Sequence, residues 1–344
     1  MAKKLSIKNK DDVEKLLTKG FQSGNLSFLI GSGASSPAVP LAGPIERELN
    51  DLLKQDKKAE YESKLAGFLI AIQNSTNDAL ANPFIAPYAN VLEAYQNFLV
   101  LLSEILEARR TKLLSKQATV FTTNYDVLIE MAAEELQMLR LNDGFQRIPS
   151  MRGEHYFRPE TFFEVTHSTG NLFNYEFALP TINLVKLHGS LTWAGKDSAI
   201  SYRNPHLIVP DSKKATYLKD LEAFTKSFSL IVPTFAKFER TLMERVYYDL
   251  LRLLANRLDL ENSLIVAFGF SFEDEHILDI VNRALKNPTL LLLVFAHSQT
   301  AVASYLDKFK KHNNVVVIHP EDADKLGFTE LNLLLSCVKP KTLT

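Results

Sequence analysis

Residues 26–35 read LSFLIGSGAS, and this stretch decides the fold class of the chain. Its first half is dominated by Leu, Phe and Ile, as in parallel strands that are buried on both faces of a sheet. The run then stops abruptly at five small residues, Gly31, Ser32, Gly33, Ala34 and Ser35. Glycines at the end of a strand allow a tight turn and a close approach by other backbone. The stretch therefore predicts a buried strand that turns towards a helix.

Three later segments repeat this pattern. Short apolar runs stop at Thr123-Asn124-Tyr125-Asp126, at His188-Gly189-Ser190 and at Gly269-Phe270-Ser271. In open α/β sheets the carboxyl ends of parallel strands lie on one edge, and ligands bind at that edge. We therefore predict an α/β fold with a Rossmann-like parallel sheet flanked by helices, in which the four loops meet.

The rest of the chain indicates how this sheet is elaborated. We expect one domain over residues 1–344. Residues 44–115 contain no convincing strand but have apolar residues at helical spacing, which predicts a helical layer or insertion. Segments 142–180 and 195–235 show little periodicity, and we expect them to be insertions that cover the site. Strand-like and helix-like runs alternate again from 238 to 319, which is typical of βαβ units.

The composition argues against several classes of site. The chain has 39 basic and 40 acidic residues and a formal net charge of -1, so no polycationic surface for nucleic acid is predicted. Cys337 is the only cysteine, which rules out an intrachain disulfide and a four-cysteine zinc module. The histidines show no metal-ligand spacing, so we expect no metal. No apolar run is long enough to span a bilayer, and we expect a cytoplasmic protein.

The first two loops each have a structural and a functional interpretation. Gly31 and Gly33 would let backbone N–H groups approach a pyrophosphate, but a tight turn also needs glycine. Asn124 or Asp126 could cap the helix predicted after them. An amide and a carboxylate at this place could equally hold ribose hydroxyls and an attacking water. The sequence leaves these alternatives open.

His188 is the main candidate for acid–base chemistry. An imidazole changes its protonation near neutral pH and can act as a general base. A lone histidine beside a glycine is more often structural, but His188 follows the third apolar run and so shares the predicted edge with the other loops. Two weaker candidates are Trp193, as a pocket wall or as ordinary core, and Lys237, as a phosphate contact or as a solvated lysine.

The motifs GSGAS, TTNYD, KLHGS and GFS, in this order, resemble those of the sirtuin family over about residues 25–320. The longer forms TTNYD, KLHGSLTW and GFSFEDEH resemble in particular the sirtuin-like proteins of bacterial anti-phage defence systems, many of which cleave NAD. Zinc-containing sirtuin deacylases differ from this chain at two points. They carry a four-cysteine module that this chain cannot build, and they have Gln where Thr123 stands.

The resemblance also implies roles for individual residues. Asn124 and Asp126 would face the nicotinamide ribose, and His188 would be the catalytic histidine. The other positions would contact NAD: Gly31, Ser32, Gly33, Ala34 and Ser35 at the pyrophosphate, and Gly269 and Ser271 at the adenosine half. Thr123 is expected as a further contact. Asp274 could reach the adenine ribose, but an acidic residue just after a strand also suits the first turn of the following helix.

Three functions are compatible with these features. The favoured one is an NAD glycohydrolase that releases nicotinamide and ADP-ribose, or a cyclic form, and depletes NAD in abortive infection. The second is an NAD-dependent protein deacylase or ADP-ribosyltransferase, and the third is a non-catalytic subunit that binds NAD or ADP-ribose. Because an uncontrolled NADase would kill its host, the resemblance implies a homo-oligomer or a separately encoded partner such as a HerA-type ATPase.

Overall fold

The computed structural model describes most of the chain. The described residues are 1–109, 113–137, 139–145, 151, 153–170, 176–196, 199–214, 216–230, 241–321 and 324–339. Lys237 falls outside these residues, so its predicted phosphate contact has no structural description.

The centre of the fold is an eight-stranded sheet in which every adjacent pair of strands is parallel. The strand order is β1-β12-β11-β10-β2-β3-β7-β4. This arrangement confirms the predicted Rossmann-like α/β fold. The strands are β1 (Lys3–Ser6), β2 (Asn25–Ile30), β3 (Gln117–Thr122), β4 (Leu141–Asn142), β7 (Thr181–Lys186), β10 (Ser263–Phe268), β11 (Leu291–Phe295) and β12 (Val315–His319).

The order of the strands creates a switch point beside β2. The chain runs from β2 to β3 and β7 on one side, then crosses to β10 on the other side of β2. Loops that leave two neighbouring strands in opposite directions open a crevice at their carboxyl ends. The Gly31 loop follows β2 and the Gly269 loop follows β10, so both lie at this crevice.

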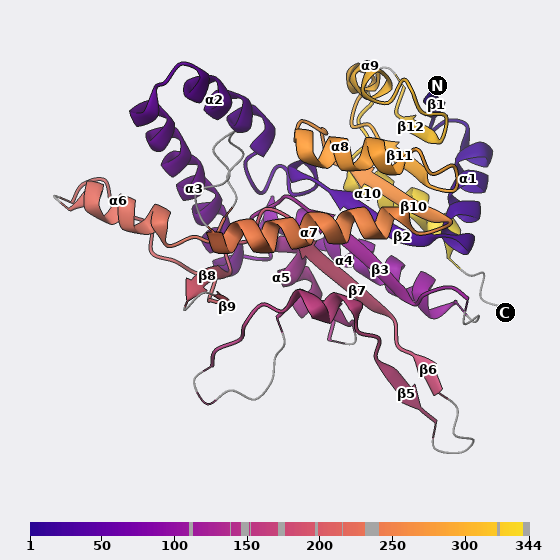
Figure 1. Cartoon of the computed structure of the whole chain (residues 1–344), viewed down its shortest axis with the longest axis horizontal. Coiled ribbons are helices and arrows are strands. Elements are labelled where there is room, and N and C mark those ends of the chain that lie inside the picture. The colour runs from indigo at the N-terminus through magenta and orange to yellow at the C-terminus, as the bar shows by residue number, and fades with distance from the viewer. Residues whose placement is uncertain are drawn as a thin grey trace.

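Helices cover both faces of the sheet (Figure 1). Alternate strand residues point to opposite faces. Phe28 accordingly belongs to the core formed with α1, α4 and α10, and Leu29 to the core formed with α7, α8 and α9. The helices are α1 (Lys10–Ser23), α2 (Ala42–Lys54), α3 (Lys58–Ala81), α4 (Tyr88–Glu107), α5 (Leu128–Glu134), α6 (Tyr217–Lys226), α7 (Thr241–Asp259), α8 (Glu275–Ala284), α9 (Gln299–Lys308) and α10 (Phe328–Leu335).

Helices α2, α3 and α4 occupy the segment for which helical spacing predicted a helical layer. In Figure 1, α2 and α3 extend away from the sheet, whereas α4 packs against it. Two small hairpins, β5 (His167–Thr169) with β6 (Glu176–Ala178) and β8 (Trp193–Lys196) with β9 (Ala199–Tyr202), lie largely within the segments expected to be insertions. Within the described part of the chain, no helix has the length and apolar character needed to cross a membrane.

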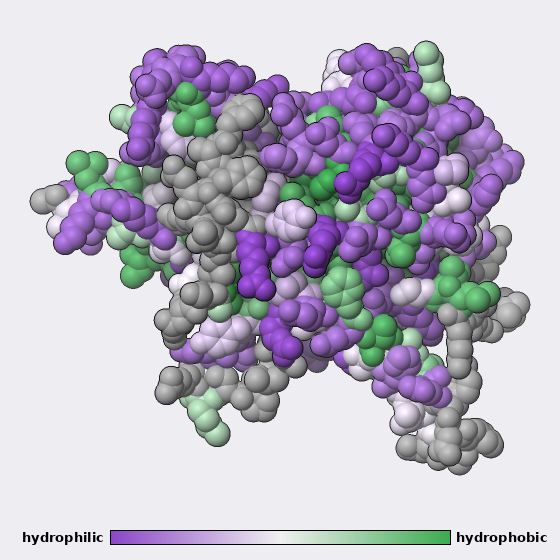
Figure 2. All heavy atoms as spheres, in the orientation of Figure 1, coloured by the Kyte–Doolittle hydropathy of each residue, from purple (hydrophilic) through white to green (hydrophobic). Residues whose placement is uncertain are grey.

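The surface seen in Figure 2 is mainly hydrophilic, with hydrophobic side chains in scattered groups. It is notched between the part formed by α2 and α3 and the part formed by α8 and α9. Residues of α2 and of the loop before α8 line a common cavity.

Candidate active site

Four strands end at the same level of the sheet. Their last residues pair across the sheet in the order Phe268, Ile30, Thr122 and Lys186. The four loops predicted from the sequence therefore leave one edge side by side, which confirms that the sheet brings them together. Asn124 and His188 occupy equivalent places, each two residues beyond the paired ends of β3 and β7.

The first and fourth loops contact each other so closely that Gly31 and Gly269 have no room for a side chain. The amide of Gly33 donates to the carbonyl of Gly269 over 3.0 Å. A Cβ on Gly31 would lie 2.3 Å from the Gly269 carbonyl oxygen, and a Cβ on Gly269, whose φ is +62°, would lie 2.5 Å from the Ala34 nitrogen. Both distances are too short for any side chain. The tight-turn interpretation therefore accounts for these glycines without a ligand.

The amide hydrogens of the Gly31 loop are largely engaged within the protein. Gly31 donates to Phe268, Ala34 to Gly31 and Ser35 to Ser32, at 3.0 to 3.2 Å. Groups bonded in this way do not cradle a phosphate. The pyrophosphate contact predicted for this loop stays a prediction, and any such contact falls mainly to the exposed parts of the loop and to side chains nearby.

A cavity of about 380 Å³ opens at this edge of the sheet. Its volume lies within the range of small-molecule sites, about 300–1,000 Å³. Eight of the residues predicted to form the site are in its wall: Gly31, Ser32, Gly33, Thr123, His188, Gly269, Ser271 and Asp274. Ala34, Ser35, Asn124 and Asp126 are not in the wall; they are buried directly behind it.

His188 is almost completely buried, with 1% of its side chain exposed. Its Nε2 lies 3.0 Å from Oδ2 of Asp274, and its ring lies beside the rings of Tyr125 and Tyr247, with centroid distances of 6.4 and 6.0 Å. Neither ring nitrogen has a hydrogen-bond partner among the residues that the structure describes. A buried polar atom without a partner is uncommon and indicates a place for a ligand or water.

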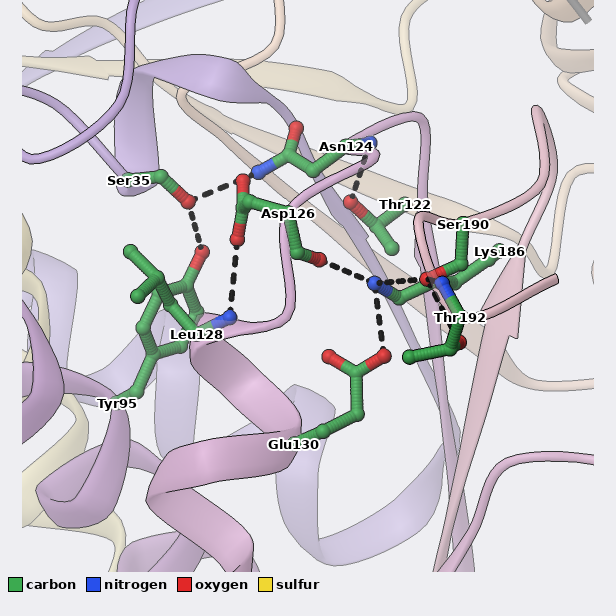
Figure 3. Close-up of polar contacts among 10 residues, drawn as sticks. All are labelled: Ser35, Tyr95, Thr122, Asn124, Asp126, Leu128, Glu130, Lys186, Ser190 and Thr192. Carbon is green, nitrogen blue, oxygen red and sulfur yellow. Dashed lines mark hydrogen bonds and ion pairs between the residues drawn. The ribbon is translucent and has the colours of Figure 1, made fainter. Parts of the chain in front are cut away.

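Asn124 is held by a chain of hydrogen bonds from the first loop and α4 (Figure 3). Its amide nitrogen donates to the Gly31 carbonyl at 3.2 Å and to the Ser35 hydroxyl at 3.1 Å. Ser35 is in turn 3.0 Å from the hydroxyl of Tyr95, and burial raises the pKa of that phenol. The side-chain oxygen of Asn124 is buried and has no partner in the described part of the chain.

Asp126 and Lys186 connect the second and third loops. One Asp126 carboxylate oxygen accepts from the amide of Leu128, the first residue of α5, at 3.2 Å, whereas the N-cap position of this helix is Val127. The ammonium group of Lys186 donates to the main-chain carbonyl of Asp126, lies 2.8 Å from Glu130 Oε1 and 3.3 Å from the Ser190 hydroxyl (Figure 3). Burial raises the pKa of Glu130, and the charge of Lys186 opposes that shift.

A family model described as SIR2-like domain matches residues 118–318. The match includes the Asn124, His188 and Gly269 loops. The chain belongs to the SIR2-like domain family. No curated protein matches it. The matched residues begin within β3, so β2 and the Gly31 loop precede them, and the sheet joins that loop to the rest of the SIR2-like site.

SIR2-like domains bind NAD and are typically NAD-dependent enzymes. The residues of this SIR2-like domain fit that ligand in two respects. The cavity lies at the switch point where open α/β sheets bind nucleotides. Asn124 and His188 present buried polar atoms that need partners, which ribose hydroxyls and water would supply.

The structure adds residues that sequence reasoning missed. Arg47 and Glu46 of α2, with His297 and Tyr305, also line the cavity. Arg47 is a cationic side chain in this wall. Tyr305 donates to the Phe270 carbonyl at 3.0 Å, and burial raises the pKa of its phenol to about 12. No motif marks these positions: the packing of α2 and α9 brings Glu46, Arg47 and Tyr305 to the sheet edge, and His297 lies in the loop between β11 and α9.

Trp193 belongs to the core of this SIR2-like domain. It is 2% exposed and packs against Phe145 and Phe157, away from the cavity wall. Among the residues described, no group of three or more His, Cys, Asp or Glu side chains is arranged to hold a metal ion.

Proposed function

We propose that this SIR2-like domain is an NAD glycohydrolase that cleaves the bond between nicotinamide and ribose. One observation carries the proposal. Asn124 and His188, at equivalent positions beyond two paired strands, hold buried polar atoms without described partners; His188 lines the cavity at the switch point, and Asn124 bonds to Gly31 of its wall. An amide and an imidazole placed in this way suit the activation of water at a ribose carbon.

Cleavage of the bond between ribose and nicotinamide requires few catalytic groups. The bond from ribose C1′ to the nicotinamide nitrogen breaks, and its electron pair stays with nicotinamide, which leaves as a neutral molecule. No general acid is therefore needed for departure. The site must hold the ribose, stabilise the positive charge that develops on it and direct water to C1′.

Described residues are suited to holding the ribose and directing the water. Asn124, held in place by Gly31 and Ser35, would orient water and ribose hydroxyls through its free oxygen. His188 would accept a proton from the water as its oxygen bonds to C1′. Arg47 in the cavity wall would attract the pyrophosphate. Asp126 keeps the second loop in place through α5 and Lys186.

The biological role is proposed from the motifs. TTNYD, KLHGSLTW and GFSFEDEH resemble those of sirtuin-like anti-phage proteins, so we propose that cleavage depletes NAD during infection. Activity would then be controlled by self-association or by a separate partner such as a HerA-type ATPase. NAD levels in infected cells that carry wild type or His188→Ala would test this role, and equal NAD loss in both would contradict it.

The enzymatic test uses purified protein and NAD, with nicotinamide and ADP-ribose separated by chromatography. We expect His188→Ala and Asn124→Ala each to lower turnover by about 10² to 10⁴, as losses of a general base or water-orienting group do. His206→Ala is the matched control, because His206 is exposed and outside the cavity wall. Full turnover by His188→Ala would refute the assignment. Turnover that requires an acylated peptide would favour a deacylase, and tight NAD binding without turnover would favour a regulatory subunit.

A further inference from the structure

His188 meets a carboxylate that arrives from the far side of the switch point. His188 follows β7, whereas Asp274 precedes α8 in the loop that follows β10. The imidazole Nε2 and Asp274 Oδ2 are 3.0 Å apart, and the two side chains are only 1% and 6% exposed. Nε2 and Oδ2 lie at ion-pair distance, but the contact does not have the geometry of a hydrogen bond. The interaction between the two side chains is therefore electrostatic.

Among the described residues, the two aromatic rings that flank His188 carry no charge near pH 7. Tyr125 and Tyr247 flank the ring, and burial raises the pKa of both phenols. The charges of Glu46 and then Asp274 add to the shift of Tyr125, and the charge of Asp274 adds to that of Tyr247, so both phenols are neutral near pH 7. Glu46, Glu273 and Arg47 line the same cavity. Asp274 is the carboxylate in contact with the imidazole.

We propose that Asp274 is a positioning residue that stabilises the protonated form of His188 during the reaction. The inference rests on the proposed glycohydrolase function. When water oxygen bonds to ribose C1′, its proton passes to His188, and the imidazolium forms beside the buried Asp274 carboxylate. Asp274 stays ionised throughout, and His188 later releases the proton to solvent. A carboxylate at this distance favours the charged imidazole because little water screens the pair.

Asp274 also has a structural task, and the test must separate the two. Its Oδ1 accepts from the amide of Ile277 at 3.1 Å, which makes it the N-cap of α8. Asn and Ser cap helices about as well as Asp does. Asp274→Asn and Asp274→Ser therefore keep the cap and remove the charge that faces His188. Glu275→Gln is the matched control, since it removes an exposed charge from the next position.

The first readout is kcat and KM for NAD across pH. We expect both Asp274 variants to lose about tenfold or more in kcat, up to the roughly 10² to 10⁴ that general-base catalysis supplies, with a smaller change in KM. Without the carboxylate the imidazole holds a proton less tightly, so the acidic limb of the rate profile should move to lower pH. Glu275→Gln should match wild type. A lower kcat with an unmoved acidic limb would show a merely structural role and overturn the proposal.

The second readout does not depend on turnover. In ¹⁵N-labelled protein, the imidazole signal missing from His188→Gln identifies His188 among the eight histidines. Its titration should occur at lower pH in Asp274→Asn than in wild type, and equal titration in the two proteins would overturn the inference. If wild type fails to cleave NAD, the glycohydrolase proposal falls while this measurement still decides whether Asp274 acts on His188.

Discussion

Lys186 and Glu130 form an ion pair beneath the candidate site, with 2.8 Å between Nζ and Oε1 and only 4% of the lysine side chain exposed. The same ammonium group bonds to the carbonyl of Asp126 and the hydroxyl of Ser190. Lys186 therefore connects the loop that carries Asn124 to the loop that carries His188. The relative position of these loops therefore depends on a charged side chain that is not part of the cavity wall.

Lys186→Met should destabilise the protein because it leaves Glu130 in the interior without its partner. Breaking a buried pair costs about 3–5 kcal/mol, and we expect the lower end because Glu130 is 22% exposed. Urea unfolding of the variant and wild type measures this difference. The double variant Lys186→Met with Glu130→Leu removes both charges and should recover part of the loss. A double variant no more stable than Lys186→Met would show that the pairing is not the cause.

Glu130 should also make stability depend on pH. Burial raises its pKa above the ordinary 4.5, so the folded protein holds this proton more tightly than the unfolded chain does. Its contribution to stability is complete below the unfolded value and is lost as pH rises through the folded value. Wild type should therefore lose stability relative to Glu130→Gln as pH rises from about 4.5. Denaturant titrations at several pH values test this, and parallel curves for the two proteins would contradict it.

Gly269→Ala should damage the contact between the first and fourth loops. The new Cβ would lie 2.5 Å from the Ala34 nitrogen, and the φ of +62° disfavours any side chain. We expect a loss of about 1–3 kcal/mol and weaker NAD binding, measured by thermal unfolding and calorimetry. Gly67→Ala is the control: nothing lies within 4 Å of its Cβ in α3, so it should be neutral or stabilising by about 0.5–1 kcal/mol. Equal effects of the two substitutions would argue against strain at residue 269.

Tyr95→Phe tests whether the hydroxyl of Tyr95 helps to orient Asn124 through Ser35. The ring keeps its edge contact with Phe328, while Ser35 loses the hydroxyl 3.0 Å away. One hydrogen bond is worth about 1 kcal/mol, so we expect that loss of stability and a fall in kcat of about fivefold to tenfold, less than for Asn124→Ala. Steady-state kinetics of Tyr95→Phe and Ser35→Ala, compared with wild type, test whether the hydrogen bonds from Tyr95 through Ser35 to Asn124 affect kcat. An unchanged kcat in both variants would mean that Asn124 is oriented without this chain.

Much of the fold was readable from local sequence. The apolar runs before Gly31, Thr123, His188 and Gly269 predicted the central strands, because strands buried on both faces need continuous apolar residues. Apolar residues at helical spacing predicted α2, α3 and α4, because a helix that packs against a core needs apolar residues along one face. Strands β1 and β4 were missed. They are short edge strands of four and two residues with polar side chains, and only pairing with β12 and β7 makes them strands.

The sequence by itself determined the strand-and-loop order, the family motifs and the lack of a four-cysteine module, since each depends on residue types near one another in the chain. Only the tertiary structure decided what the loop residues contact. In the tertiary structure, Ser35 and Asp126 are buried outside the cavity wall, whereas Arg47 is part of that wall. Asp274 lies in contact with His188. Such contacts join residues far apart in the chain. They follow from strand order, register and helix packing, which no single segment encodes.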